Sequence, residues 1–75
     1  MFDPESFELA IRMRAIRLRQ GLKQTEVARR MGLDPSMPSL WERGKRLVPR
    51  HRVPALAAAL EVSVDELRGQ ADGRD

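Results

Sequence analysis

The sequence predicts an all-α fold, a compact domain of five short helices. The chain has 75 residues and no cysteine, so one apolar core must stabilise it without disulfides or a thiolate metal site. Apolar residues recur at helical spacing, and no stretch shows the alternation of a half-buried strand. Glycine, proline and capping residues mark helix ends along the chain. We expect residues 1–68 to form the domain and residues 69–75 a flexible polar tail.

The first helix should begin at Asp3, which can cap it, with Pro4 in the first helical position and Gly21 as a left-handed end. One apolar stripe on this helix is expected to face the core: Leu9, Met13 and Ile16. A second stripe exceeds what one small core needs and is a candidate surface for a partner or a dimer: Phe7, Ile11 and Leu18.

The second helix is predicted over Gln24–Met31, followed by a three-residue turn (Gly32, Leu33 and Asp34) and a third segment that reaches Arg43. Pro38 would be an early residue of that segment, where it lacks the N–H of the first intrahelical bond and crowds the preceding turn. We therefore expect the third helix to be frayed or to start late, near Met37.

The fourth helix is predicted from Val53–Pro54 to Leu60. Ser63 and Glu66 form a capping box that opens a short fifth helix ending at Leu67. The core predicted from these helices contains seven larger side chains: Met13, Ile16, Val27, Leu33, Trp41, Leu56 and Leu60.

Charge is distributed unevenly along the chain. The net charge is +3, but Ala10–Arg52 contains twelve Lys and Arg against three acids, a local balance of +9, and each flank sums to −3. Such a basic middle indicates a positive face for a polyanion, although arginines that solvate helix surfaces would give the same count.

Several classes of function have no support in the sequence. No nucleophile–base pair, metal-ligand cluster or phosphate loop occurs, so we expect neither an enzyme nor a cofactor or metal. No apolar run approaches the roughly 20 residues of a membrane span, and no signal peptide opens the chain. The expected location is the cytoplasm.

The second and third helices form the most informative unit. Helices joined by so short a turn cross steeply, and the second then projects as a ridge that can enter a major groove of duplex DNA. Ala28 is small enough for the close approach that this crossing needs. The same hairpin also occurs in purely structural bundles.

Six segments at consistent spacing resemble the Cro/CI-type (XRE) helix-turn-helix family over residues 10–68: Arg14–Arg17, Gly21–Gln24, Val27–Ala28, Met31–Leu33, Ser39–Gly44 and Leu56–Leu67. The resemblance implies a lambda-repressor-like domain in which helices two and three form the helix-turn-helix. It also implies a repressor-like transcriptional regulator that binds double-stranded operator DNA, usually as a homodimer. The family often pairs through its fourth and fifth helices, and the long first helix offers another surface.

Family roles transfer to individual positions. Gln24 matches a glutamine that binds a backbone phosphate, and Lys23 replaces the usual Ser or Thr cap at a cost of about 1 kcal/mol. Further backbone contacts are expected at the end of the recognition helix and beyond it: Arg43, Lys45, Arg46 and Arg50, with His51 and Arg52 next to them. Arg17 and Glu42 match a partly buried ion pair that fixes the first and third helices.

The positions that should read bases depart from the family pattern: Ser36, Met37, Ser39 and Leu40, next to Pro35. Only the serines can hydrogen-bond, while Met37 and Leu40 can contact thymine methyl groups. Phosphate contacts should therefore dominate affinity. Glu61 stands where the family usually has glycine, which predicts mild backbone strain.

An alternative stays open at this point. The helix-turn-helix fold can be a protein–protein interaction module, antitoxin- or co-regulator-like, with weak or non-specific DNA binding. Its interface would be the apolar recognition surface around Pro35, Met37 and Leu40 together with the second stripe of the first helix.

Overall fold

The computed structural model describes residues 4–69. Its elements are α1 (Pro4–Arg19), α2 (Gln24–Met31), α3 (Met37–Glu42), a 3₁₀ turn η1 (Arg50–Arg52), α4 (Val53–Ala59) and α5 (Val64–Leu67). The prediction of an all-α fold with five helices is confirmed. Asp3 and residues 70–75, expected to cap the first helix and to form the tail, lie outside the described residues. Within residues 4–69, no helix is long and apolar enough to cross a membrane.

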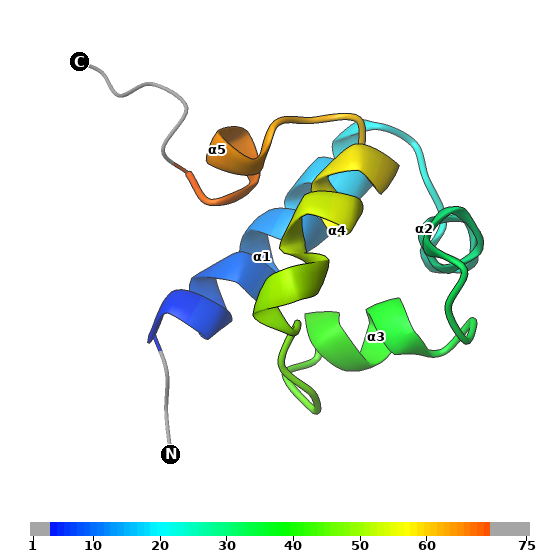
Figure 1. Ribbon diagram of the computed structural model, residues 1–75, viewed down its shortest axis with the longest axis horizontal. Coiled ribbons are helices and arrows are strands. Elements are labelled where there is room, and N and C mark those ends of the chain that lie inside the picture. The colour runs from blue at the N-terminus through cyan, green and yellow to red at the C-terminus, as the bar shows by residue number, and fades with distance from the viewer. Residues whose placement is uncertain (1–3, 70–75) are drawn as a thin grey trace.

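The helices pack around one core. α2 contacts α3 and α4, α1 contacts α3 and α5, and α5 also contacts α4, so that α2 and α3 lie at one end of the bundle and α5 at the other (Figure 1). Met13, Val27, Leu56 and Leu60 are fully buried, as is Leu67. The core prediction is confirmed except at Leu33, which is half-buried against the core from outside.

α1 ends as the sequence predicts. Gly21 has a φ of 73°, its N–H donates to the Leu18 carbonyl at 3.1 Å, and the Leu22 N–H donates to the Arg17 carbonyl at 3.0 Å. This Schellman pattern pairs the last carbonyls of the helix and needs one residue in the left-handed region.

α4 ends in the same pattern, but with Glu61 in the left-handed position at a φ of 65°. For a residue with a Cβ this conformation costs about 1–2 kcal/mol. The strain predicted at Glu61 is therefore present. Two side chains from outside α4 hold the adjacent carbonyls: Arg30 of α2 donates to Ala59 O at 2.8 Å, and Gln20, just after α1, donates to Leu60 O at 3.0 Å.

α3 starts late, as the prolines predict. Its first residue is Met37, which makes Pro38 the second helical residue, where a helix has no intrahelical partner for the N–H. The missing N–H therefore costs no bond, and the Pro38 ring is buried. The predicted three-residue turn was wrong: the connection between α2 and α3 spans residues 32–36.

Candidate nucleic-acid interface

The start of α2 has no side-chain cap. Lys23 is the N-cap in extended conformation, with φ −88° and ψ 155°, and its side chain makes no capping bond. Its carbonyl accepts from Glu26 N at 3.0 Å and Val27 N at 3.1 Å. The earlier N–H groups of a helix have no intrahelical acceptor, so this end combines unpaired donors with an exposed lysine. Such an end suits an anion.

Glu42, at the end of α3, joins three helices. Its side chain is 2% exposed and accepts from Arg17 of α1 through Nε at 2.7 Å and Nη2 at 3.1 Å. Arg17 also donates Nη1 to the Leu22 carbonyl at 2.9 Å. The pair expected from the sequence is thus present, bidentate and nearly enclosed, a geometry that restricts both side chains.

Gln24 is a third partner of the same carboxylate, which sequence reasoning did not find. Its Nε2 donates to Glu42 Oε1 at 3.0 Å, although the two residues are 18 positions apart. One of its two amide hydrogens is therefore engaged, and the other remains for a phosphate. The contact fixes the side chain at the start of α2 relative to α3.

An aspartate turn precedes the recognition helix. Asp34 Oδ1 accepts from Ser36 N at 2.9 Å and from Ser36 Oγ at 2.6 Å. The hydroxyl bond first, and then the backbone bond, hold the pKa of Asp34 below its ordinary value, because both favour the carboxylate. The Ser36 hydroxyl hydrogen is committed to Asp34, so towards a base this residue acts as an acceptor.

The other predicted base-reading residues lie on α3 with different exposure. Ser39 and Leu40 are half-buried, and Met37 is half-buried because it packs against the core. Pro35, just before the helix, is exposed. The apolar surface that α3 exposes is therefore smaller than the sequence predicted.

The ion pairs divide the cations of residues 4–69 into two groups. Seven arginines lie within 4 Å of a carboxylate: Arg12, Arg14, Arg17, Arg19, Arg29, Arg30 and Arg68. Six cations have no ion pair in this part of the chain: Lys23, Arg43, Lys45, Arg46, Arg50 and Arg52. The second group lies at the start of α2 and along the segment from the end of α3 to η1.

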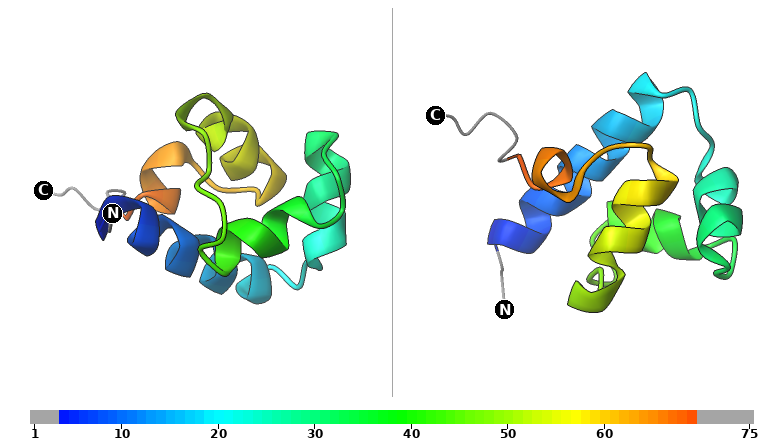
Figure 2. Two further views of the ribbon diagram at one scale, coloured as in Figure 1. Left: turned by 90° about the horizontal axis from the view of Figure 1, so that it is seen from below. Right: turned by 45° about the horizontal axis from the view of Figure 1, so that its top comes forward.

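Seen from below in Figure 2, α3 and the segment that follows it lie towards the viewer, with α2 beside them. Arg43, Lys45 and Arg46 are exposed in this region. Only the Arg43 side chain makes a hydrogen bond among these three, a weak one of 3.4 Å from Nε to Ser39 O. The three side chains are therefore available to phosphates.

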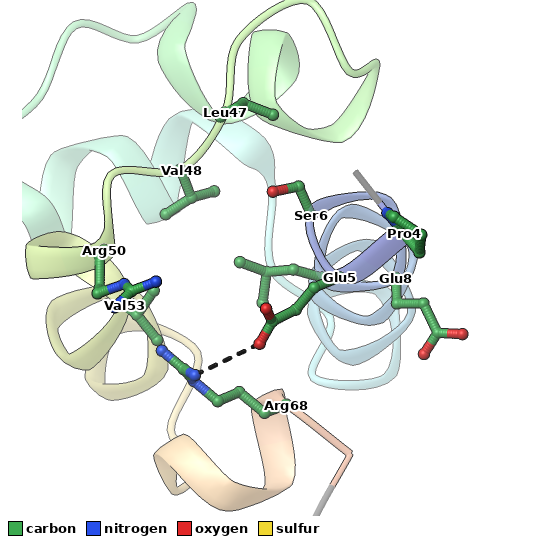
Figure 3. A pocket seen from close by; sticks show the side chains of 10 residues that line it. Pro4, Glu5, Ser6, Glu8, Leu47, Val48, Arg50, Val53 and Arg68 are labelled. Atoms are coloured by element: carbon green, nitrogen blue, oxygen red, sulfur yellow. Dashed lines mark ion pairs between the residues drawn. The ribbon is translucent and has the colours of Figure 1, made fainter. Parts of the chain in front are cut away.

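Arg50 has a different setting. It lines a hollow of about 460 Å³ between the start of α1, the segment before α4 and α5, together with Val48, Glu5 and Arg68 (Figure 3). Arg68 and Glu5 face each other across it at 3.7 Å. Arg50 is exposed, and none of the other predicted backbone contacts lines this hollow. Within residues 4–69 no cluster of acids and histidine suits a metal ion.

Comparisons with known proteins agree on one kind of fold and family. Residues 8–69 match a family described as a helix-turn-helix domain. The solved structure of a hypothetical transcription factor, NHTF from Neisseria, is 35% identical with a TM-score of 0.77, and the match covers 84% of this chain and 72% of that one. No curated protein matches the chain.

Two further solved structures are similar. The restriction-modification controller protein C.AhdI from Aeromonas hydrophila is 34% identical with a TM-score of 0.78, and the match covers 87% of this chain and 98% of that one. The clp gene regulator ClgR from C. glutamicum is 26% identical with a TM-score of 0.79, covering 91% and 88%.

Proposed function

Because the chain belongs to the helix-turn-helix domain family and is a DNA-binding transcriptional regulator of the Cro/CI type, we propose that α3 docks in the major groove while cations at its rim hold the phosphate backbone. We further propose that it binds as a homodimer to a site with two-fold symmetry, with half-sites roughly 34–36 Å apart. Its relatives are regulators, so the chain is a binding protein and not an enzyme. We propose that the protein acts in the cytoplasm, where it binds DNA.

The observation that carries this proposal is the grouping of unpaired cations. Apart from Arg50 and Arg52, the arginines elsewhere in residues 4–69 are held by carboxylates. Four cations near the two helices of the motif have no carboxylate partner: Lys23, Arg43, Lys45 and Arg46. A cation without a protein partner gains more from a phosphate, because no existing ion pair has to break. Gln24 adds an amide hydrogen and the helix N-terminus to the same backbone.

Sequence readout should be a small part of the affinity. The proposed base contacts are Ser36, Met37, Ser39 and Leu40, none of which offers the paired donors and acceptors of Gln, Asn or Arg. We expect Ser36 to accept from a base, and Leu40 to contact a thymine methyl group. Contact by Met37 requires it to leave part of its packing on the core.

Salt dependence tests the proposal. If four side chains per protomer each neutralise one phosphate, the slope of log K against log salt is about −3.6 per protomer, and affinity falls by roughly 100-fold between 50 and 200 mM salt. Fluorescence anisotropy with a labelled duplex measures both values. A slope shallower than about −1, or no binding at 50 mM salt, would reject the backbone contacts.

A matched pair of variants locates the contacts. Lys45→Ala with Arg46→Ala removes two unpaired cations and should reduce the slope by about 2. Arg29→Ala with Arg68→Ala removes the same charge from paired sites, and should change affinity far less. Equal losses of affinity for both double variants would mean that DNA binding depends on the net charge of the protein and not on the unpaired cations near α2 and α3.

The protein-interaction alternative expected an apolar recognition surface around Pro35, Met37 and Leu40. Two of these side chains are half-buried, so no large apolar patch lies on α3. The other surface on which that hypothesis relied, the second stripe of α1, is exposed.

A further inference from the structure

Large apolar side chains are exposed on one part of the molecule. Within residues 4–69 they are Phe7 at 55%, Ile11 at 54% and Leu18 at 53% on α1, and Leu47 at 63% in the segment after α3. No apolar side chain larger than alanine or proline is exposed on α4 or α5. An apolar surface for association is therefore found on α1 and not on the two helices through which related domains often pair.

The three α1 residues form one continuous face. With 3.6 residues per turn, Phe7, Ile11 and Leu18 point within about 40° of one another around the helix axis. Arg14 falls on the same face and is 61% exposed. Phe7, Ile11 and Leu47 line a hollow of about 220 Å³ between α1 and the end of α3, which continues this face towards the segment after α3.

We propose that this face of α1 is a homodimer interface, with α1 of a second copy lying antiparallel across it. A two-fold axis midway between positions 12 and 13 places Phe7 against Leu18 of the partner subunit and Ile11 against Arg14 of the partner subunit. The interface is then self-complementary, as a two-fold dimer requires. This interface rests on the proposed function in one respect: an operator with two-fold symmetry requires a dimer with two-fold symmetry.

Charge along α1 favours a second copy in this orientation. The described acids of α1, Glu5 and Glu8, lie in its first half and are 78% and 65% exposed, while Arg14 and Arg19 in its second half are 61% and 57% exposed. Antiparallel pairing brings each acidic half to a basic half, whereas parallel pairing would oppose like charges. These four side chains have ion-pair partners in their own protomer, so the charges set the orientation and need not form new ion pairs. The aliphatic stem of Arg14 would cover Ile11 of the partner subunit.

The small residues on α1 allow close approach. Ala10 is half-buried and Ala15 is exposed, and the two flank the apolar face on either side. A single pair of 16-residue helices buries an area at the low end for specific interfaces, so we expect a dissociation constant in the micromolar range, on the order of 10 μM.

Crosslinking tests the orientation directly, because the chain has no cysteine of its own. Phe7→Cys and Leu18→Cys are made as separate proteins. In the antiparallel dimer, two copies of either position lie about 16 Å apart along the helix axis, while position 7 faces position 18 of the partner. A short bismaleimide should therefore join the two proteins when they are mixed and neither protein alone. Crosslinking of each variant alone would refute the arrangement.

Sedimentation equilibrium over roughly 1–200 μM protein, without DNA, tests the interface itself. Ile11→Lys should raise the dissociation constant at least tenfold, and Ala58→Lys, at an exposed position of α4, should leave it unchanged. A dimer weakened by Ala58→Lys and not by Ile11→Lys would refute the proposal in favour of α4, and so would a monomer at 200 μM. Unaltered circular dichroism of both variants shows that they fold.

These outcomes are separable from those for DNA binding. A wild-type monomer that still binds duplex DNA with the expected salt slope would reject the α1 interface and retain the proposed function. A dimer that crosslinks between positions 7 and 18 but binds no DNA would retain the α1 interface and reject the proposed function.

Discussion

Replacing Glu42 with alanine should destabilise the domain by about 3 kcal/mol, because it leaves a nearly buried guanidinium without its carboxylate. The side chains of Arg17 and Glu42 are 10% and 2% exposed, and two of the hydrogen bonds between them are lost together with the one from Gln24. Arg17 would keep only its bond to the Leu22 carbonyl at 2.9 Å.

The size of this loss can be compared with the stability of the whole domain. At 0.05–0.15 kcal/mol per residue, 75 residues give a free energy of unfolding of about 4–11 kcal/mol. A loss of about 3 kcal/mol would lower Tm by roughly 12–24 °C in a domain of this size. Arg17→Met combined with Glu42→Leu should cost less than Glu42→Ala alone, since no unpaired charge remains.

Urea unfolding followed by tryptophan fluorescence measures the wild type, Glu42→Ala, the double variant and its two single variants, Arg17→Met and Glu42→Leu. Trp41 is the only tryptophan and is 2% exposed, so its emission reports the loss of the core. The reasoning fails if Glu42→Ala costs less than about 1 kcal/mol, or if the double variant is at least as unstable as the sum of the singles.

Three further changes should have separable effects. Glu61→Gly should raise the free energy of unfolding by about 1 kcal/mol, because glycine adopts the left-handed conformation without strain. Glu61→Ala loses the same 3.0 Å pair with Arg30 and should not be stabilised. Chemical denaturation compares the two variants, and equal stabilities would exclude strain as the cause. Lys23→Ser should add a cap and stabilise α2 by about 1 kcal/mol. The same change should reduce the salt slope of DNA binding by about 1, because one phosphate contact is lost. A more stable variant with an unchanged slope would show that Lys23 does not contact a phosphate. Asp34→Asn keeps an acceptor for Ser36 but removes an anion beside the proposed DNA face, so affinity should rise about threefold at low salt. Because the pKa of Asp34 is lowered in the folded state, its contribution to stability is present at neutral pH and is lost as pH falls below the ordinary value of 3.8 and on through the folded pKa. Urea melts between about pH 3 and 6 should show a larger loss of stability for the wild type than for Asp34→Asn, since the other carboxylates are protonated in both.

Features set by local chemistry were predictable from the sequence. Gly21 and Gly44 take the left-handed conformation that ends a helix, and Pro38 delays α3. Ser63 accepts from Glu66 N at 3.0 Å, which is one half of the predicted capping box, while the Glu66 carboxylate accepts from Arg19 instead. Each depends on residues within a few positions of one another, where the rules for caps and proline apply directly.

Features that depend on contacts distant in sequence were not predictable. The bond from Gln24 to Glu42 arises because α2 packs on α3, and nothing near Gln24 in the sequence announces it. The length of the connection between α2 and α3 was missed because the bonds from Ser36 to Asp34 shape residues 34–36 as a turn. Which cations lack a carboxylate is likewise a property of tertiary packing, and it divides the arginines in a way that their positions in the chain do not show.

The convergence of α1, α2 and α3 on one carboxylate affects how genetic data on this protein should be interpreted. A screen for loss of regulation would recover changes at Glu42 as readily as changes at residues that touch the operator, although Glu42 is itself 2% exposed. Second-site suppressors would separate the two kinds of allele. A defect at Glu42 should be rescued by substitutions that restore packing against Arg17, whereas a lost contact with DNA should be rescued only by new contacts with DNA.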